Sequence, residues 1–205
     1  MSTKLIVTIP VWLDRVCVWP LLIYRLLRYG WPFRKIPLGE GLFTIVDPAL
    51  FYWLNNYHWS ARRNSNCIYA VRFLNDPGKK PKIISMHREI MNPRKGLLVD
   101  HRNRDSLDNR RDNLRIATHS QNQFNKAKTS EKTSSRFIGV YLEKRSGLWV
   151  TKISHHGKSI WLGRFKSELA AARAYDTAAR KYHKEFARLN FPDIKAENAE
   201  AAGKF

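Results

Sequence analysis

The most informative residues of the sequence are Val99-Asp100-His101, Asn113-Leu114-Arg115 and, further on, Asn122. The apolar residues before Asp100 predict a short buried strand, and Asn113–Ala117 predicts a second one. Thr118 or Ser120 can then cap a helix that runs through Asn125. Two antiparallel strands with a long loop, followed by a packed helix, can bring the polar side chains of these segments close together.

The residue types in this stretch suit phosphodiester hydrolysis. The carboxylate of Asp100 and the amide oxygen of Asn122 are hard ligands of the kind that Mg²⁺, Mn²⁺ or Ca²⁺ prefers. Successive side chains of a strand point to opposite faces, so His101 faces away from Asp100 and suits a different task. We interpret His101 as the general base that deprotonates an attacking water.

Longer stretches around these residues resemble an HNH endonuclease of the phage and homing type. The matching pieces, which cover about residues 36–126, are Ile36-Pro37-Leu38, Val46-Asp47, Trp59, Met86–Met91, Val99-Asp100-His101, Leu107–Arg115 and Asn122-x-x-Asn125. The resemblance implies a ββα-metal fold in which Asp100 and Asn122 bind Mg²⁺ or Mn²⁺ and His101 is the base. It also implies that Asn113 braces the loop that holds the histidine, which makes these four residues the catalytic candidates.

Other polar residues of this region have less specific interpretations. His119 can share a helix face with Asn122, or it can serve as a cap or a phosphate contact. His87 is expected to be structural. Five arginines are most simply phosphate contacts, although some could pair with neighbouring aspartates: Arg102, Arg104, Arg110, Arg111 and Arg115.

Residues 134–192 carry a different pattern. Three strand-like segments cover Phe137–Tyr141, Leu148–Ile153 and Ser159–Gly163, and Glu168–Phe186 has the spacing of a helix. One stripe of this helix is formed by Ala171, Ala174, Tyr175, Ala178 and Tyr182. Small alanines allow the helix to lie close to a three-stranded sheet, whose other face is then free to enter the major groove of DNA.

This segment resembles the plant Apetala-two/ethylene-response-factor DNA-binding domain. The resemblance rests on Gly139-Val140, Trp161-Leu162-Gly163-x-Phe165, Ala171–Ala179 and Leu189-Asn190-Phe191-Pro192. It implies that Trp161 contacts a base or sugar and that Tyr175 contacts the DNA backbone. Positions that hold arginine in that family are here Ile138, Tyr141, Glu143 and Ser159. The candidate replacement contacts are Lys144, Arg145, Lys152, Lys158 and Arg164.

The composition supports a nucleic-acid partner. The chain has 205 residues, 43% of them hydrophobic, and carries 37 Lys+Arg against 17 Asp+Glu, a formal charge of +20. This balance indicates a folded protein that binds a polyanion, with nucleic acid favoured over a membrane surface, and the two resemblances imply double-stranded DNA. Two cysteines, Cys17 and Cys67, exclude a disulfide scaffold and fit a reducing compartment, so we expect a cytoplasmic, nucleoid-associated protein.

The N-terminal 34 residues are strongly apolar, yet each uncharged stretch is too short to cross a bilayer. We expect no membrane insertion and interpret the segment as a buried or interfacial structural element, with a peripheral docking helix as the alternative. The predicted domains are this segment (1–34), a nuclease domain (35–126), a linker (127–135), a DNA-binding domain (136–193) and a tail (194–205).

The sequence therefore predicts an α+β protein. A mixed N-terminal region precedes the ββα-metal core, and a three-stranded antiparallel sheet packed on one helix follows. The predicted function is a metal-dependent DNA endonuclease, monomeric or homodimeric, that hydrolyses phosphodiester bonds. The alternatives are a non-catalytic, sequence-specific DNA-binding regulator and a basic RNA-binding protein.

Overall fold

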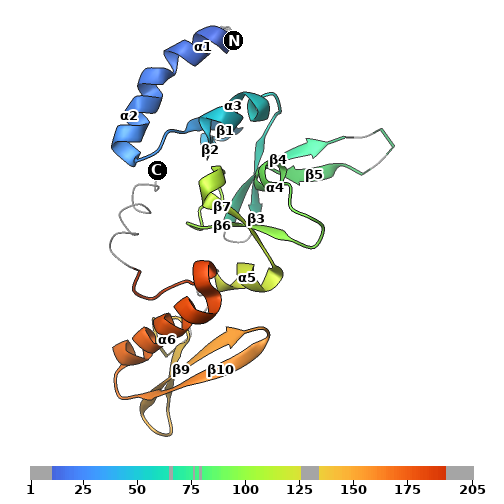
Figure 1. The fold of residues 1–205 in the computed structure, drawn as a ribbon. Coiled ribbons are helices and arrows are strands. Elements are labelled where there is room, and N and C mark those ends of the chain that lie inside the picture. The colour runs from blue at the N-terminus through green and yellow to red at the C-terminus, as the bar shows by residue number, and fades with distance from the viewer. Residues whose placement is uncertain (1–10, 65–66, 76, 79, 126–133, 193–205) are drawn as a thin grey trace.

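The computed structural model describes residues 11–64, 67–75, 77–78, 80–125 and 134–192. Figure 1 shows an N-terminal part, residues 11–125, and a C-terminal part, residues 134–192, with the end of the last helix beside the short helix α5 of the first part. Most of the predicted linker and the predicted tail lie outside the described residues.

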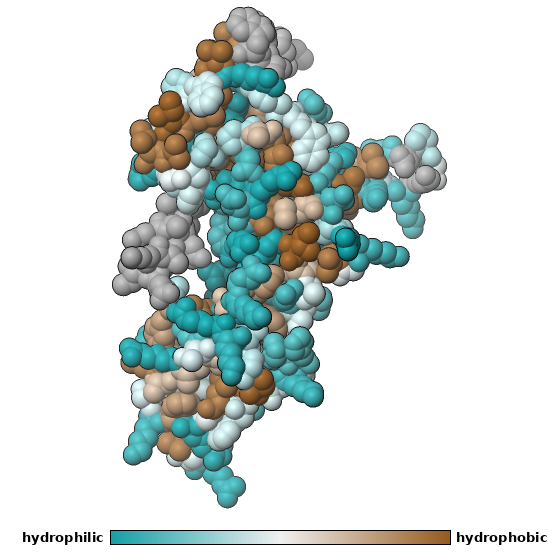
Figure 2. All heavy atoms as spheres, viewed as in Figure 1, coloured by the Kyte–Doolittle hydropathy of each residue, from teal (hydrophilic) through white to brown (hydrophobic). Residues whose placement is uncertain are grey.

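The chain begins with two helices, α1 (Val11–Cys17) and α2 (Trp19–Tyr29). Pro20 lies in the first turn of α2, and Gly30 ends it in the left-handed conformation, φ +81°. No residue of α2 is buried, and Figure 2 shows apolar side chains gathered over this helix. The predicted burial is therefore absent from α2. No helix in the described part of the chain is long and apolar enough to cross a membrane.

The next elements form two small antiparallel sheets. The hairpin of β1 (Arg34–Gly39) and β2 (Leu42–Val46) leads into α3 (Pro48–Asn55). The second sheet has the order β3-β4-β5, and α4 follows it directly. The bounds of these elements are Ser60–Asn64 for β3, Cys67–Leu74 for β4, Lys82–Ser85 for β5 and Met86–Met91 for α4.

One hydrophobic cluster joins these elements to the predicted strand pair. Val46, Leu54 and Met86 are fully buried and pack with Val99 and Leu114 of that pair. Burial of such side chains contributes about 1.5–3 kcal/mol each. The upstream hairpin and α3 therefore support the strand pair rather than forming a separate unit.

The strand pair consists of β6 (Leu98–His101) and β7 (Leu114–Ala117), with Asp100 opposite Arg115 and His101 opposite Leu114. A 3-10 turn, η1 (Arg111–Asn113), precedes β7. The helix α5 (His119–Phe124) begins at Thr118, whose hydroxyl accepts from the Gln121 backbone N–H while the Gln121 side chain accepts from the Thr118 N–H.

The C-terminal part is a three-stranded antiparallel sheet with one helix across it. The strands are β8 (Val140–Glu143), β9 (Leu148–His155) and β10 (Lys158–Phe165), with β9 in the centre. The helix α6 (Glu168–His183) continues into the 3-10 turn η2 (Lys184–Phe186). This confirms the predicted α+β class and the sheet-on-helix arrangement.

Several boundaries in this part differ from the prediction by one to three residues, and two of the differences have a local cause in the backbone. The first strand begins at Val140 rather than Phe137, because Gly139 adopts φ +73° and a Cβ there would lie 2.1 Å from the ring of Tyr175. The helix ends at His183 rather than Phe186, because Lys184 has φ +52° and leaves the helical path. The change of chain direction at Lys184 leaves the turn His183–Phe186 next to α5 of the N-terminal part.

Candidate active site

A cavity of about 660 Å³ lies between the β3-β4-β5 sheet and the β6–β7 pair. Its lining includes Asp100, His101 and Asn122, the three residues predicted to do chemistry, together with Asn125 and His87. The two segments that carry these residues, β6 and α5, therefore meet at one cavity.

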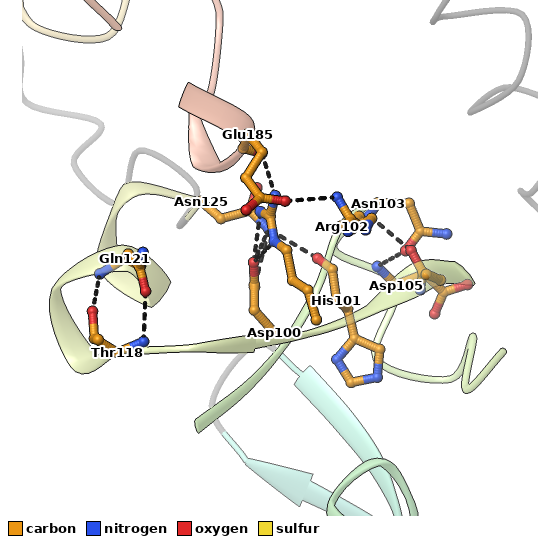
Figure 3. Close-up of polar contacts among 11 residues, drawn as sticks. Asp100, His101, Arg102, Asn103, Asp105, Thr118, Gln121, Asn125 and Glu185 are labelled. Atoms are coloured by element: carbon orange, nitrogen blue, oxygen red, sulfur yellow. Dashed lines mark hydrogen bonds and ion pairs between the residues drawn. The ribbon is translucent and has the colours of Figure 1, made fainter. Parts of the chain in front are cut away.

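Asp100 is 7% exposed and lies in a dense set of donors (Figure 3). Its Oδ2 accepts from Arg115, with Nε at 2.8 Å and the ion-pair nitrogen at 2.7 Å. The amide of Asn125 donates to Oδ1 at 3.0 Å and to the backbone carbonyl of His101 at 2.8 Å. Burying a carboxylate without such partners is costly, and here they also fix its orientation.

The side chain of His101 leaves β6 on the side opposite to Asp100 (Figure 3). Its Nε2 lies 3.4 Å from Oδ1 of the fully buried Asn109, whose own amide donates to Thr44 Oγ1 at 2.7 Å. The Thr44 hydroxyl donates in turn to the carbonyl of Leu107 at 2.6 Å. Because Asn109 presents its oxygen to the ring, His101 Nε2 must be the donor, and Nδ1 keeps the lone pair.

The loop that carries Asn109 is held against β2. The N–H of Ile45 donates to the carbonyl of Leu107, and the carbonyl of Ile45 accepts from the N–H of Asn109, at 2.9 and 2.8 Å. The upstream hairpin therefore positions the Asn109 and Thr44 side chains that reach the imidazole.

Burial keeps both imidazoles of the cavity neutral. Desolvation lowers the pKa of His101, although the contact with Asn109 opposes this effect. Desolvation, followed by the nearby His101 and Arg88, lowers the pKa of His87 to about 3. The two rings lie edge to face with centroids 5.2 Å apart. A neutral His101 can accept a proton at neutral pH.

Asn113 closes the loop between β6 and β7. Its Oδ1 accepts from the backbone N–H of Asn103 at 3.0 Å, and its Nδ2 donates to the carbonyl of Asp108 at 2.8 Å. Both bonds cross the loop, and neither involves the cavity. This placement fits a bracing residue rather than one that contacts substrate.

The two asparagines of α5 have different surroundings. Asn122, the predicted metal ligand, lines the cavity, whereas Asn125 makes the direct hydrogen bonds to Asp100. Asn125 belongs to the same motif, but its hydrogen bond to Asp100 joins residues 25 positions apart, and no local pattern in the sequence predicts it.

The five predicted phosphate-contact arginines fall into two groups. Arg110 pairs with Asp108 at 2.6 Å and Arg115 pairs with Asp100, and both are buried. These pairings favour structural roles over phosphate contacts. Arg102, Arg104 and Arg111 have exposed side chains, so the phosphate-contact prediction stays with them.

The donor set fits a hard divalent cation. No group of three or more His, Cys, Asp or Glu side chains that could hold a metal occurs among the residues that the structure describes. A metal at the cavity would therefore rely on one carboxylate, amide oxygens and water. This set suits Mg²⁺ or Mn²⁺ better than Zn²⁺.

The free face of the C-terminal sheet carries the predicted DNA contacts. Trp161 is 58% exposed and lies opposite Lys152 in the β9–β10 register. Arg164 lies over the Trp161 ring at 5.9 Å and pairs with Glu143. The remaining predicted contacts on this part are exposed: Lys144, Arg145 and Lys158.

Tyr175 departs from its predicted role. It is only 7% exposed and packs in the core with Ile153, Ala178 and Ala179. Its ring fills the space that Gly139 leaves open. These surroundings favour a packing role over a contact to the DNA backbone.

Comparisons with known proteins match both parts of the chain. Residues 92–124 match the HNH endonuclease family model, and residues 135–185 match the AP2 domain model. An uncharacterised HNH endonuclease of Acanthamoeba polyphaga mimivirus is 31% identical over 171 residues, which cover 79% of this chain and 82% of the viral protein. These matches define an endonuclease-type core joined to a DNA-binding domain.

The chain belongs to the HNH endonuclease family. Its C-terminal part is also similar to plant proteins. An AP2/ERF and B3 domain-containing protein of Oryza sativa subsp. japonica is 42% identical over 76 residues, and an APETALA2-like protein 2 of Oryza sativa subsp. indica is 45% identical over 58. These matches cover 37% and 28% of this chain, which spans only 20% and 13% of the two plant proteins.

Proposed function

We propose that this protein is a divalent-metal-dependent DNA endonuclease of the homing type, with a ββα-metal core in residues 35–126 and a DNA-recognition domain in residues 136–193. One observation carries the proposal. Asp100, His101 and Asn122 line a single cavity, in a chain whose two matched domains are an HNH endonuclease and an AP2 domain.

Asp100 and Asn122 are the residues that would hold Mg²⁺ or Mn²⁺. The bound metal would polarise the scissile phosphate and stabilise the leaving 3′ oxygen. Arg115 and Asn125 hold the Asp100 carboxylate in a fixed orientation for this task.

His101 acts as the general base. Its Nε2–H is directed to Asn109, so the Nδ1 lone pair takes the proton from the attacking water. Asn113 has no part in proton transfer, and its two loop hydrogen bonds hold the backbone around His101. Asp100 and His101 both line the cavity in which the scissile phosphate would bind.

The C-terminal sheet supplies most of the DNA recognition. Trp161 offers an exposed aromatic face, and the lysines and arginines around it are placed for phosphate contacts. Because one chain carries one candidate site, a monomer nicks one strand, and double-strand cleavage needs a homodimer or two events. A DNA substrate places the protein at the nucleoid or in the nucleus.

The test is a plasmid-nicking assay with and without EDTA. We expect wild-type nicking in Mg²⁺, none in EDTA, and at least a hundredfold slower nicking by Asp100→Asn, which retains the shape of the side chain. Asp112→Asn is the matched control, since Asp112 is exposed in η1, and it should nick normally. Nicking that survives EDTA would refute metal dependence. Tight DNA binding without cleavage by the wild type would favour the non-catalytic regulator.

A further inference from the structure

The two matched domains contact each other next to the candidate site. The turn His183–Phe186 at the end of α6 lies against α5 and β7, the elements that carry Asn122 and Arg115 (Figure 1). The Asp100 carboxylate is held by Arg115 and Asn125, both of the N-terminal part, and the turn contacts the first of these directly.

The first contact is a ring stack. Phe124, on the last turn of α5, stacks on His183 with centroids 3.6 Å apart and planes 6° from parallel. His183 is itself fixed, because its Nε2–H donates to the carbonyl of Ser154 at 2.7 Å. Burial lowers the pKa of His183, so the ring stacks as a neutral imidazole. The central strand of the C-terminal sheet thereby holds α5.

The second contact surrounds Arg115. The guanidinium that pairs with Asp100 also donates to the backbone carbonyl of Glu185 and lies 4.0 Å from the ring centroid of Phe186. Phe186 is buried. Figure 3 shows Glu185 above Asp100 and Asn125, with its carboxylate directed towards Arg102. The guanidinium is thus held between a carboxylate of one domain and a carbonyl and a ring of the other.

A third contact is weaker. Arg102 pairs with the Glu185 side chain at 3.3 Å, and both groups are about half exposed. Exposed ion pairs contribute little to stability, so the docking must depend on the stack and on the buried Arg115 contacts.

We propose that the turn His183–Phe186 of the DNA-binding domain is a positioning element of the nuclease site. It fixes the position of α5 through Phe124, and it fixes the orientation of the Asp100 carboxylate through Arg115. This inference rests on the proposed function. It implies that the DNA-binding domain contributes to the rate of the chemical step in addition to DNA affinity, because small displacements of catalytic groups are costly.

The test separates rate from affinity in the full-length protein. Phe124→Ala removes the stack without touching the predicted DNA face, and Phe124→Tyr retains it. We expect the single-turnover cleavage rate of Phe124→Ala to fall at least tenfold while the Kd for DNA changes less than twofold. Phe124→Tyr should cleave within twofold of the wild type. If Phe124→Ala does not fold, Phe124→Leu takes its place, with a loss of at least threefold expected.

Leu169→Ala is the matched control, since Leu169 is an exposed apolar residue at the other end of α6. It should leave rate and affinity unchanged. Wild-type cleavage by Phe124→Ala, an equal loss in Phe124→Tyr, or a parallel loss of rate and affinity would each overturn the proposal.

A second readout does not depend on cleavage. Backbone amide resonances of Asp100 and Arg115, which are outside the sequence neighbourhood of Phe124, should shift in Phe124→Ala and stay in place in Leu169→Ala. If the wild type does not cleave DNA, the proposed function fails, and these shifts still decide whether the turn positions the site. Unchanged shifts in Phe124→Ala would refute the positioning role.

Discussion

The candidate active site and the candidate DNA-binding face use polar residues in opposite ways. Around Asp100 and His101 most polar side chains are buried and hydrogen-bonded, as those of Asn109, Arg115 and Asn125 are. On the C-terminal sheet the candidate contacts other than Tyr175 are exposed, and the buried residues behind them are apolar, Ile153, Ala178 and Ala179 among them.

This difference follows from what each region does. Catalytic groups need fixed positions and a partly desolvated environment, so their partners must be built into the fold. Side chains that contact DNA must be exposed on the surface, so the fold provides only the sheet on which they stand. Substitutions in the first region should therefore change rate and stability, and those in the second should change affinity alone.

The largest effect that this comparison predicts is on His101. His101→Ala should lower the cleavage rate by about 10²–10⁴-fold, the usual contribution of a general base, because the proton acceptor is lost. The Kd for DNA should stay near the wild-type value in a binding assay without metal. A loss of affinity that matches the loss of rate would argue against the base assignment.

The buried His87 should make the nuclease part sensitive to acid. Its native pKa of about 3 lies below the ordinary value of 6.5, so between these values the unfolded chain binds the proton and the folded chain does not. The free energy of unfolding therefore falls as the pH drops below about 6.5.

Chemical unfolding at pH 7 and pH 5 checks this expectation. Between pH 7 and pH 5 the free energy of unfolding of His87→Gln should fall by roughly 2 kcal/mol less than that of the wild type. His119→Gln, which removes an exposed imidazole, is the control and should behave like the wild type. Equal losses in all three proteins would show that His87 ionises freely in the folded state.

Thr44 tests whether the buried network extends beyond the catalytic residues. Thr44→Val retains the shape but leaves the Asn109 amide without its acceptor, so His101 loses its fixed orientation. We expect a cleavage rate on the order of tenfold lower, with Thr44→Ser close to the wild type. The measurement is the single-turnover cleavage rate of both variants. Equal rates for Thr44→Val and Thr44→Ser would show that Thr44 does not help to orient His101.

Trp161 provides the opposite case on the exposed face. Trp161→Ala should weaken DNA binding about tenfold, as the loss of an aromatic contact to a base or sugar does. The thermal midpoint and the rate at saturating DNA should not change, since the side chain is 58% exposed. A lower midpoint would place Trp161 in the core of the domain.

The parts of the fold that were predictable carry strong local signals. The helix α3 (Pro48–Asn55) starts with a proline, and β-branched or aromatic residues fill the strand β4 (Cys67–Leu74), so the local sequence alone favours both elements. The strand Ser60–Asn64 was not predicted. Its sequence, Ser-Ala-Arg-Arg-Asn, lacks apolar alternation, and it forms a strand by pairing with β4.

The candidate site likewise has residues that the sequence predicted and contacts that it did not predict. The Asp-His pair, the bracing asparagine and the helix after it were visible as an ordered motif. The contacts of Arg115 and Asn125 with Asp100, and the Asn109–Thr44 hydrogen bond across 65 positions, depend on tertiary packing. A sequence pattern identifies the catalytic residue types of a site. The residues that orient them lie on elements that come together only in the folded protein.

The smallest expected effect is on a single lysine of the exposed face. Lys152 lies opposite Trp161 and near the Tyr141 ring, and it makes no ion pair among the contacts of the described residues. Lys152→Gln should weaken DNA binding about threefold at moderate salt and reduce the slope of log Kd against log salt by about 1. Lys181→Gln, on the outer side of α6, should leave the slope unchanged. An unchanged slope in Lys152→Gln would mean that the DNA backbone approaches another face, because a phosphate contact cannot be lost without reducing the counterion release.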